Sequence, residues 1–364
     1  MKSSYVSFIL LMIFLLPVQK KAQVTNPSPR QSVKNLIIIT TDGFRWQEIF
    51  SGADPVLLGD ETVTPDHETI ELTYGGSTPG ERRKELMPFL WNVVAKKGQL
   101  YGNRFYDNKM NVSNLYAISY PGYNEIFTGN IDLTVASNGK KENPNINVLE
   151  YLDAKPAFHG KVVAFTSWDV FPYILNEKRN KLPVNSGYEM TDSINEKTDA
   201  LNTVQQLIGS KTHTRKDRLT FIAAKNYMEQ YHPRVVYLGL GETDENAHQG
   251  RYDLYLQKAN EVDRMIAELW HWIQTTPEYK DNTTLLITTD HGRGAKDFKW
   301  SKHGAFTKGS SQTWMAVIGP GIEPLGEIKE EQQLWQKQVA QTIASLLGEE
   351  FLPGHSVAAA IPLP

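Results

Sequence analysis

The chain has 364 residues, of which 40% are apolar and 22% are charged, and its formal net charge is −3. These proportions are typical of a folded globular protein and exclude collagen-like, coiled-coil and disordered chains. No basic surplus or Lys/Arg-rich run predicts a nucleic-acid-binding surface. The chain contains no cysteine, which excludes disulfides, zinc–thiolate sites and cysteine nucleophiles. Any bound metal must therefore be held by His, Asp, Glu or hydroxyl oxygen.

The first 22 residues have the pattern of a secretory signal peptide. Lys2 precedes an apolar run at 6–18, and a helix of that length spans about 20 Å, too short for a hydrocarbon core of about 30 Å. We predict cleavage after Ala22 and export to the periplasm or the extracellular space. An uncleaved anchor is the alternative, because Lys20 stands where cleavage favours a small residue. No membrane span is predicted elsewhere.

Residues 23–32, with two Pro and several Ser, Thr and Asn, are predicted to be a linker, and residues 33–364 to form one large domain. Within that domain, buried strands are predicted at 33–40, 161–165, 234–238, 284–288 and 314–318. Helices are predicted at 251–273, with a stripe formed by Leu254, Val262, Ile266 and Leu269, and at 331–347, ending near Gly348.

This alternation predicts an α/β fold with an open, mostly parallel sheet covered by helices on both faces. Residues 168–215 are polar and lack a strand period, and a modest cap is predicted within them.

Acidic and imidazole side chains follow three of the predicted strands where each strand ends. They are Asp42, then Asp244 and His248, then Asp290 and His291, with His303 twelve residues later. Ligands of parallel α/β folds bind beyond the carboxyl ends of the strands, so we expect these side chains to gather at one edge of the sheet. Each has an ordinary structural explanation when taken alone. Together they form the N/O ligand set that zinc takes when thiolates are absent.

A nucleophile is predicted at Ser119. Pro121 follows it by two residues, and Pro is favoured in the first turn of a helix, so Ser119 is expected at a helix N-terminus. Backbone N–H groups and the helix dipole favour an anion at that place. An ordinary helix-capping Ser is the alternative, and the nearby metal ligands favour the nucleophile.

This set of residues resembles the alkaline phosphatase superfamily, and more narrowly its type I phosphodiesterase/nucleotide pyrophosphatase branch. The resemblance runs from about residue 35 to the C-terminus and includes the segments around Asp290, Trp300–Gly304 and Val317–Gly321. It implies a catalytic domain with two zinc ions, and Mn²⁺ or Fe are alternatives for the same ligands. One ion would be held by Asp244, His248 and His303, and the other by Asp42, Asp290, His291 and the Ser119 oxygen.

The resemblance also implies that Ser119 attacks phosphorus and becomes phosphorylated. The branch usually has Thr at this position. An Asn about twenty residues further on would hold a phosphoryl oxygen, and both Asn138 and Asn143 lie near that spacing. Lys178 and Arg179 are candidates for binding the extra charge of a phosphate monoester, and two solvated surface cations are the alternative.

The resulting hypothesis is an exported, zinc-dependent phosphoric ester hydrolase that acts on a small-molecule phosphate ester, more specifically a phosphodiester or nucleotide. The alternatives are a phosphomonoesterase, a phosphotransferase, a sulfatase and a non-catalytic zinc-stabilised binding module. A sulfatase requires Arg four residues after the modified Cys or Ser, whereas Tyr123 stands four residues after Ser119. The oligomeric state is not predicted.

Overall fold

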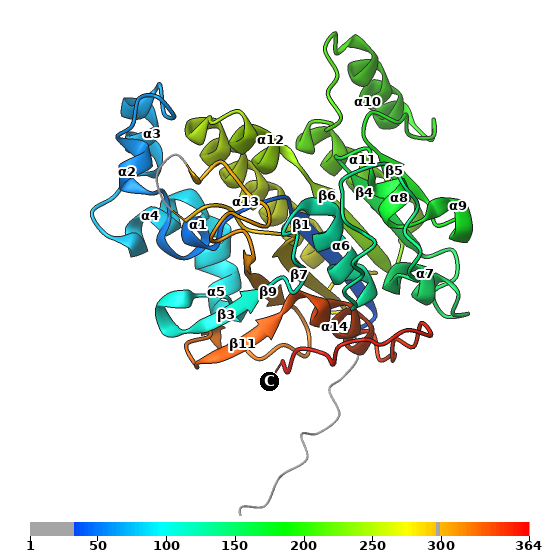
Figure 1. Cartoon of the computed structure of the whole chain (residues 1–364). Coiled ribbons are helices and arrows are strands. Elements are labelled where there is room, and N and C mark those ends of the chain that lie inside the picture. Colours follow the sequence, from blue (N-terminus) through cyan, green and yellow to red (C-terminus); the bar gives the residue numbers. More distant parts are fainter. Residues whose placement is uncertain (1–32, 296–298, 364) are drawn as a thin grey trace, which may run out of the picture. The chain divides into compact units, whose positions relative to one another are not determined.

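The computed structural model describes residues 33–295 and 299–363 (Figure 1). The predicted signal peptide and linker lie outside this part of the chain. Among the described helices, none combines the length and the apolar character that crossing a membrane requires.

The central element is an eight-stranded sheet. Its order is β10 (Gly326–Glu327), β2 (Gly98–Tyr101), β9 (Met315–Ile318), β7 (Thr283–Thr289), β1 (Asn35–Thr41), β6 (Val235–Leu240), β4 (Val162–Thr166) and β5 (Val184–Ser186). Strand β9 runs antiparallel to β2 and β7, and the other neighbours are parallel. The predicted mostly parallel α/β sheet is therefore confirmed, and β1, β4, β6, β7 and β9 correspond to the five predicted strands.

Both faces of the sheet are buried, as a parallel sheet requires. Successive side chains of β1 point to opposite faces. Ile37 and Ile39 belong to one hydrophobic core, with helices α11 (Asp217–Tyr231) and α13 (Tyr252–Thr275). Leu36 and Ile38 belong to the other, with α6 (Ser119–Thr128), α7 (Val148–Asp153) and α14 (Val339–Leu346).

Smaller elements complete the described chain. A second sheet has the order β11 (Gln332–Trp335), β3 (Asn108–Asn111), β8 (Gln312–Thr313). The remaining helical segments are α1 (Trp46–Ser51), α2 (Pro55–Leu58), α3 (His67–Tyr74), α4 (Pro79–Leu86), η1 (Leu90–Val94), α5 (Ala95–Lys97), η2 (Arg104–Tyr106), α8 (Phe171–Ile174), α9 (Glu177–Asn180), α10 (Glu196–Leu207), α12 (Glu242–His248) and η4 (Gln336–Gln338).

One helix prediction and one residue of a predicted buried stripe need correction. The helix predicted at 331–347 begins only at Val339, because residues 332–335 pair as β11 with the open edge of β3. Within β11, Leu334 is buried between two exposed neighbours, Gln333 and Trp335, and this alternation is typical of a strand and not of a helix. The helix predicted at 251–273 is confirmed as α13, but Leu254 is only half-buried and Tyr255 and Leu256 face the core instead.

Residues 168–215 form α8, α9, β5 and α10, and β5 joins the edge of the central sheet beside β4. Part of this segment therefore belongs to the core layer. The cap within it stays a prediction.

The three central strands end at the same level. Thr41 of β1 is in register with Leu240 of β6 on one side and with Thr289 of β7 on the other. The residues that follow these strands consequently emerge side by side at one edge of the sheet.

Candidate active site

Three side chains at the ends of β1 and β7 form a buried ligand group. Asp42 follows β1, Asp290 and His291 follow β7, and one ligand atom of each lies within 4.8 Å of the others. We call these three residues the first ligand group. The Nε2 atom of His291 lies 3.5 Å from Asp42 Oδ1 and 3.5 Å from Asp290 Oδ2. Two carboxylates and one imidazole around a single point are suitable ligands for a divalent cation.

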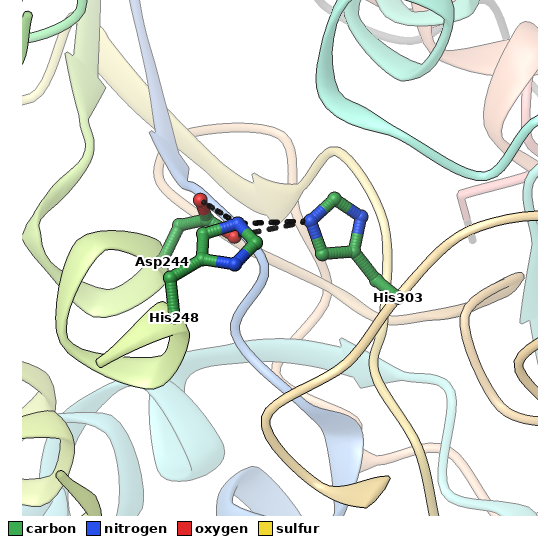
Figure 2. A group of neighbouring side chains, drawn as sticks. All are labelled: Asp244, His248 and His303. Carbon is green, nitrogen blue, oxygen red and sulfur yellow. Dashed lines mark hydrogen bonds and ion pairs between the residues drawn. The ribbon is translucent and has the colours of Figure 1, made fainter. Parts of the chain in front are cut away.

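A second ligand group consists of Asp244, His248 and His303, shown in Figure 2. Asp244 and His248 are four residues apart on α12, so they lie on one face of the helix, and His303 reaches them from the loop after β7. His248 Nε2 is 3.0 Å from Asp244 Oδ2 and 3.1 Å from His303 Nε2. This group is more accessible than the first, since half of the His248 side chain is exposed.

The two groups adjoin each other through a pair of stacked imidazoles. The rings of His291 and His303 lie with centroids 4.0 Å apart and planes 13° apart. The arrangement therefore offers two neighbouring cation positions, as two-metal hydrolytic sites require.

The electrostatics of the first group favour a bound cation. Burial, with the negative charge of Asp290 as the next cause, raises the pKa of Asp42 to about 7. Burial likewise raises the pKa of Asp290 to about 7. The Oδ2 atom of Asp290 is buried and has no hydrogen-bond partner among the described residues. A buried carboxylate oxygen without a donor is costly, and a metal ion would satisfy it.

The imidazoles are prepared to act as neutral ligands. Burial lowers the pKa of His291 and of His303, with the charge of His291 as a further cause for His303. His291 Nδ1 lies 2.9 Å from the Gly292 carbonyl oxygen, and His303 Nδ1 lies 3.4 Å from the Ala117 carbonyl oxygen. A proton on each Nδ1 would be donated to these carbonyls, which leaves each Nε2 lone pair facing its ligand group.

Ser119 is the first residue of α6 and is buried at the edge of the first group. Its Oγ atom lies 3.4 Å from Asp42 Oδ1 and 3.3 Å from His291 Nε2. Ala117, two residues earlier, has a φ of 46°, in the left-handed region that is rare for residues other than Gly. The structure thus brings together all seven residues predicted as metal ligands or nucleophile, at the edge where they were expected; their roles stay a prediction.

Two residues at the site were missed from the sequence. The Tyr123 hydroxyl donates to Asp42 Oδ2 at 3.1 Å, and the Arg293 guanidinium contacts Asp244 Oδ1. Tyr123 lies four residues after Ser119 on one helix, and this i, i+4 spacing was a usable signal. Arg293 belongs to the Asp290–Gly294 segment, and only the fold shows that it reaches α12.

The structure distinguishes the two Asn candidates. Asn138 Oδ1 accepts a hydrogen bond from the backbone N–H of Tyr120 at 3.0 Å, which places this side chain next to Ser119. Asn143 is buried, its Nδ2 donates to Asn124, and its Oδ1 accepts from the backbone of Asn145. The polar groups of Asn143 are thus used within the protein, and Asn138 is the better candidate for a substrate contact.

Both of the predicted substrate-binding cations lie near a carboxylate. Arg179 forms two hydrogen bonds with Glu150, at 2.8 and 2.7 Å, and donates to three backbone carbonyls. Lys178 is exposed and lies 3.8 Å from Glu142. Glu150 and the three carbonyls together engage the donors of the Arg179 guanidinium, which makes Arg179 a poor candidate for binding phosphate. The substrate role of Lys178 stays a prediction.

Comparisons with known proteins agree with this picture. The family model described as Sulfatase matches residues 121–349. No curated protein sequence matches significantly. Solved structures are similar in fold at low identity. Wild-type alkaline phosphatase PafA is 11% identical, with a TM-score of 0.58 over 92% of this chain and 99% of PafA.

A putative sulfatase from Bacteroides thetaiotaomicron is 12% identical, with a TM-score of 0.58 over 90% of this chain and 73% of that chain. A protein in the alkaline phosphatase superfamily from Vibrio parahaemolyticus is 12% identical, with a TM-score of 0.52 over 88% and 68%. The likenesses confirm the predicted fold. The match to the Sulfatase family model, taken with them, confirms the predicted superfamily, whose enzymes hydrolyse phosphate or sulfate esters and use metal ions.

Proposed function

The chain belongs to the Sulfatase family, and from this membership and the geometry of its site we propose that it hydrolyses phosphate esters through a phosphoserine at Ser119. The observation that carries the proposal is the position of Ser119 Oγ, 3.4 Å from Asp42 Oδ1 and 3.3 Å from His291 Nε2, at the N-terminus of α6. A hydroxyl among cation ligands at a helix N-terminus is suited to attack an anionic ester.

The residues fit two divalent cations. Asp42, Asp290 and His291 would hold one with the Ser119 oxygen, and the second ligand group would hold the other. When bound, such ions supply Lewis-acid stabilisation of charge on the attacking and leaving oxygens. Imidazole in both groups favours zinc, Mn²⁺ or Fe over Ca²⁺ and Mg²⁺, which prefer all-oxygen ligands.

The chain's own residues account for the two displacement steps. Ser119 Oγ gives up its proton and forms a bond to phosphorus as the bond from phosphorus to the departing alcohol oxygen breaks, and the alcohol leaves with a proton. Water then attacks phosphorus, the bond between Oγ and phosphorus breaks, a proton from the water returns to Ser119, and the phosphate monoester is released. Asn138 Nδ2, which has no partner among the described residues, would donate to a phosphoryl oxygen from beside the Tyr120 backbone N–H.

A phosphodiester is the proposed substrate class. Among residues 33–295 and 299–363, Arg293 is the cation found in contact with the ligand groups, and it is bound to Asp244. A phosphate monoester carries one more negative charge, which needs a donor of its own. The test compares kcat/KM for bis-p-nitrophenyl phosphate, p-nitrophenyl phosphate and p-nitrophenyl sulfate on one zinc-loaded preparation. Preference for the diester supports the proposal, and preference for the monoester contradicts this part of it.

Sulfate ester hydrolysis is the second candidate, because Pro121 stands two residues after Ser119 as in the sulfatase motif. That chemistry needs Ser119 oxidised to formylglycine. The motif also needs Arg at the position of Tyr123, whose hydroxyl instead contacts Asp42. The mass of the Ser119 peptide decides between the candidates, since formylglycine lacks two hydrogens of serine.

We also propose export, on the signal-peptide pattern of residues 1–22. N-terminal sequencing of the protein from fractionated cells tests this. A mature chain beginning near Gln23 in the exported fraction is expected, and an intact N-terminus in the cytoplasmic fraction would contradict it.

A further inference from the structure

Three large apolar side chains are exposed on loops next to the candidate site. Phe306 is fully exposed, and Leu115 and Leu133 are 72% and 60% exposed. Leu115 lies four residues before Ser119, and Phe306 lies three residues after His303. None of the three contributes to a hydrophobic core.

The three loops are neighbours in space. The Tyr116 hydroxyl, next to Leu115, donates to the Leu133 carbonyl oxygen at 2.7 Å. Gly304, two residues before Phe306, approaches the same loop, since a Cβ atom on it would lie 4.0 Å from the Tyr116 carbonyl oxygen. Single exposed apolar residues are normal on a protein surface, and three of them on adjoining loops beside one site are a local concentration. We call Leu115, Leu133 and Phe306 the apolar rim.

The rim is connected to the reacting groups by the same loops. His303 Nδ1 lies 3.4 Å from the carbonyl oxygen of Ala117, two residues after Leu115. Asn138, five residues after Leu133, accepts a hydrogen bond from the Tyr120 backbone N–H beside Ser119. A substituent on a phosphate held at Ser119 would therefore leave the site past these loops.

We propose that the apolar rim binds a hydrocarbon substituent of the substrate, so that the preferred esters carry an alkyl or acyl chain. The inference rests on the proposed phosphodiesterase activity and adds the chemical class of the second substituent. The side chains of the rim are largely exposed, so the rim suits a flexible chain that is covered on one side. Full burial of a methylene is worth roughly a fourfold change in binding, and one-sided burial about twofold.

The test measures kcat/KM for p-nitrophenyl alkyl phosphates with ethyl, butyl and hexyl chains, all as monomers in solution. Four added methylenes should raise kcat/KM about 16-fold from ethyl to hexyl. In the double variant Leu115→Ser/Phe306→Ser, the hexyl-to-ethyl ratio should fall below about 4. The matched control is Leu207→Ser, on α10, where Leu207 is 79% exposed and the ratio should stay unchanged.

A second arm presents long-chain esters in phosphatidylcholine vesicles. The wild-type protein could hydrolyse long-chain esters faster than short-chain esters only when they are presented in vesicles. If the rim variant loses that difference, the rim binds hydrocarbon at a lipid surface. Measurable turnover with no dependence on chain length in either arm would overturn the inference and leave the phosphodiesterase proposal intact. Absence of turnover for every phosphodiester would instead refute the proposed function.

Discussion

Removing the Tyr123 hydroxyl should weaken the first ligand group without disturbing the core. Burial raises the pKa of Tyr123 well above its usual value, so the phenol stays protonated and donates to Asp42 Oδ2 at 3.1 Å. Tyr123→Phe keeps the ring and its contact with Phe171, whose centroid is 4.6 Å away. The change therefore removes the hydrogen bond to the Asp42 carboxylate, together with weaker contacts to the Thr40 and Tyr237 hydroxyls, and creates no large cavity.

The expected loss of zinc affinity follows from the hydrogen bond to Asp42. A hydrogen bond to a charged group contributes about 1.5–3 kcal/mol, and the loss of a partner that orients a metal ligand costs about 10–100-fold in affinity. The hydrogen bond also favours the ionised form of Asp42, so its loss raises the pKa of Asp42 further and lets protons compete better with the metal. We expect zinc affinity at neutral pH to fall by about 10–100-fold.

The matched control is Tyr120→Phe on the same helix. The Tyr120 hydroxyl donates to backbone carbonyls of Lys141 and Tyr173, away from both ligand groups. Competition with a chromogenic chelator measures zinc affinity, and thermal unfolding of metal-free protein measures stability. Both variants should lose some stability, and only Tyr123→Phe should lose zinc affinity. Equal zinc affinity in the two variants would refute the reasoning.

Four further changes test other parts of the site. Burial raises the pKa values of Asp42 and Asp290 to about 7, and both carboxyl groups must lose their protons to bind a metal, so zinc affinity should rise as the pH increases towards 7. Calorimetry at pH 6 in two buffers of different ionisation enthalpy should detect protons released on zinc binding, and no release would contradict this. His248→Ala should lower the metal content from two ions to one by elemental analysis. Gly122→Ala should lower the free energy of unfolding by about 1–3 kcal/mol in a denaturant titration, since its Cβ would lie 2.4 Å from the Asp290 carbonyl oxygen. Arg293→Lys keeps the positive charge but loses the planar guanidinium that contacts both Asp244 and the Gly43 carbonyl oxygen, so zinc binding by the second ligand group should weaken. The unfolding temperature should change less in Arg293→Lys than in Arg293→Met, which also loses the charge.

The sequence was sufficient to predict the sheet and the edge that carries the site. The candidate metal ligands follow β1, β6 and β7 in the sequence. Thr41, Leu240 and Thr289 are in register, so the residues after these three strands lie close together. The prediction succeeded because parallel strands place their carboxyl ends at one edge.

Features that depend on side-chain partners were beyond the sequence. Spacing alone did not separate Asn138 from Asn143, because the difference lies in the partners Tyr120 and Asn124. Arg179 was open to a substrate role until the fold placed Glu150 beside it. The local pattern of residues 332–335 does not reveal β11, because its pairing partner, β3, lies more than two hundred residues away in the sequence.

The most direct test of the central claim is the chemical state of Ser119 during turnover. Zinc-loaded protein is mixed with bis-p-nitrophenyl phosphate and quenched in acid, and the Ser119 peptide is analysed by mass spectrometry, with Ser119→Ala as the control. We predict a p-nitrophenyl phosphoryl adduct on the Ser119 oxygen, because only one of the two p-nitrophenol groups leaves in the first step. We also predict near-complete loss of turnover in the variant, with both metals retained. Formylglycine at this position, or turnover that persists in Ser119→Ala, would contradict the account.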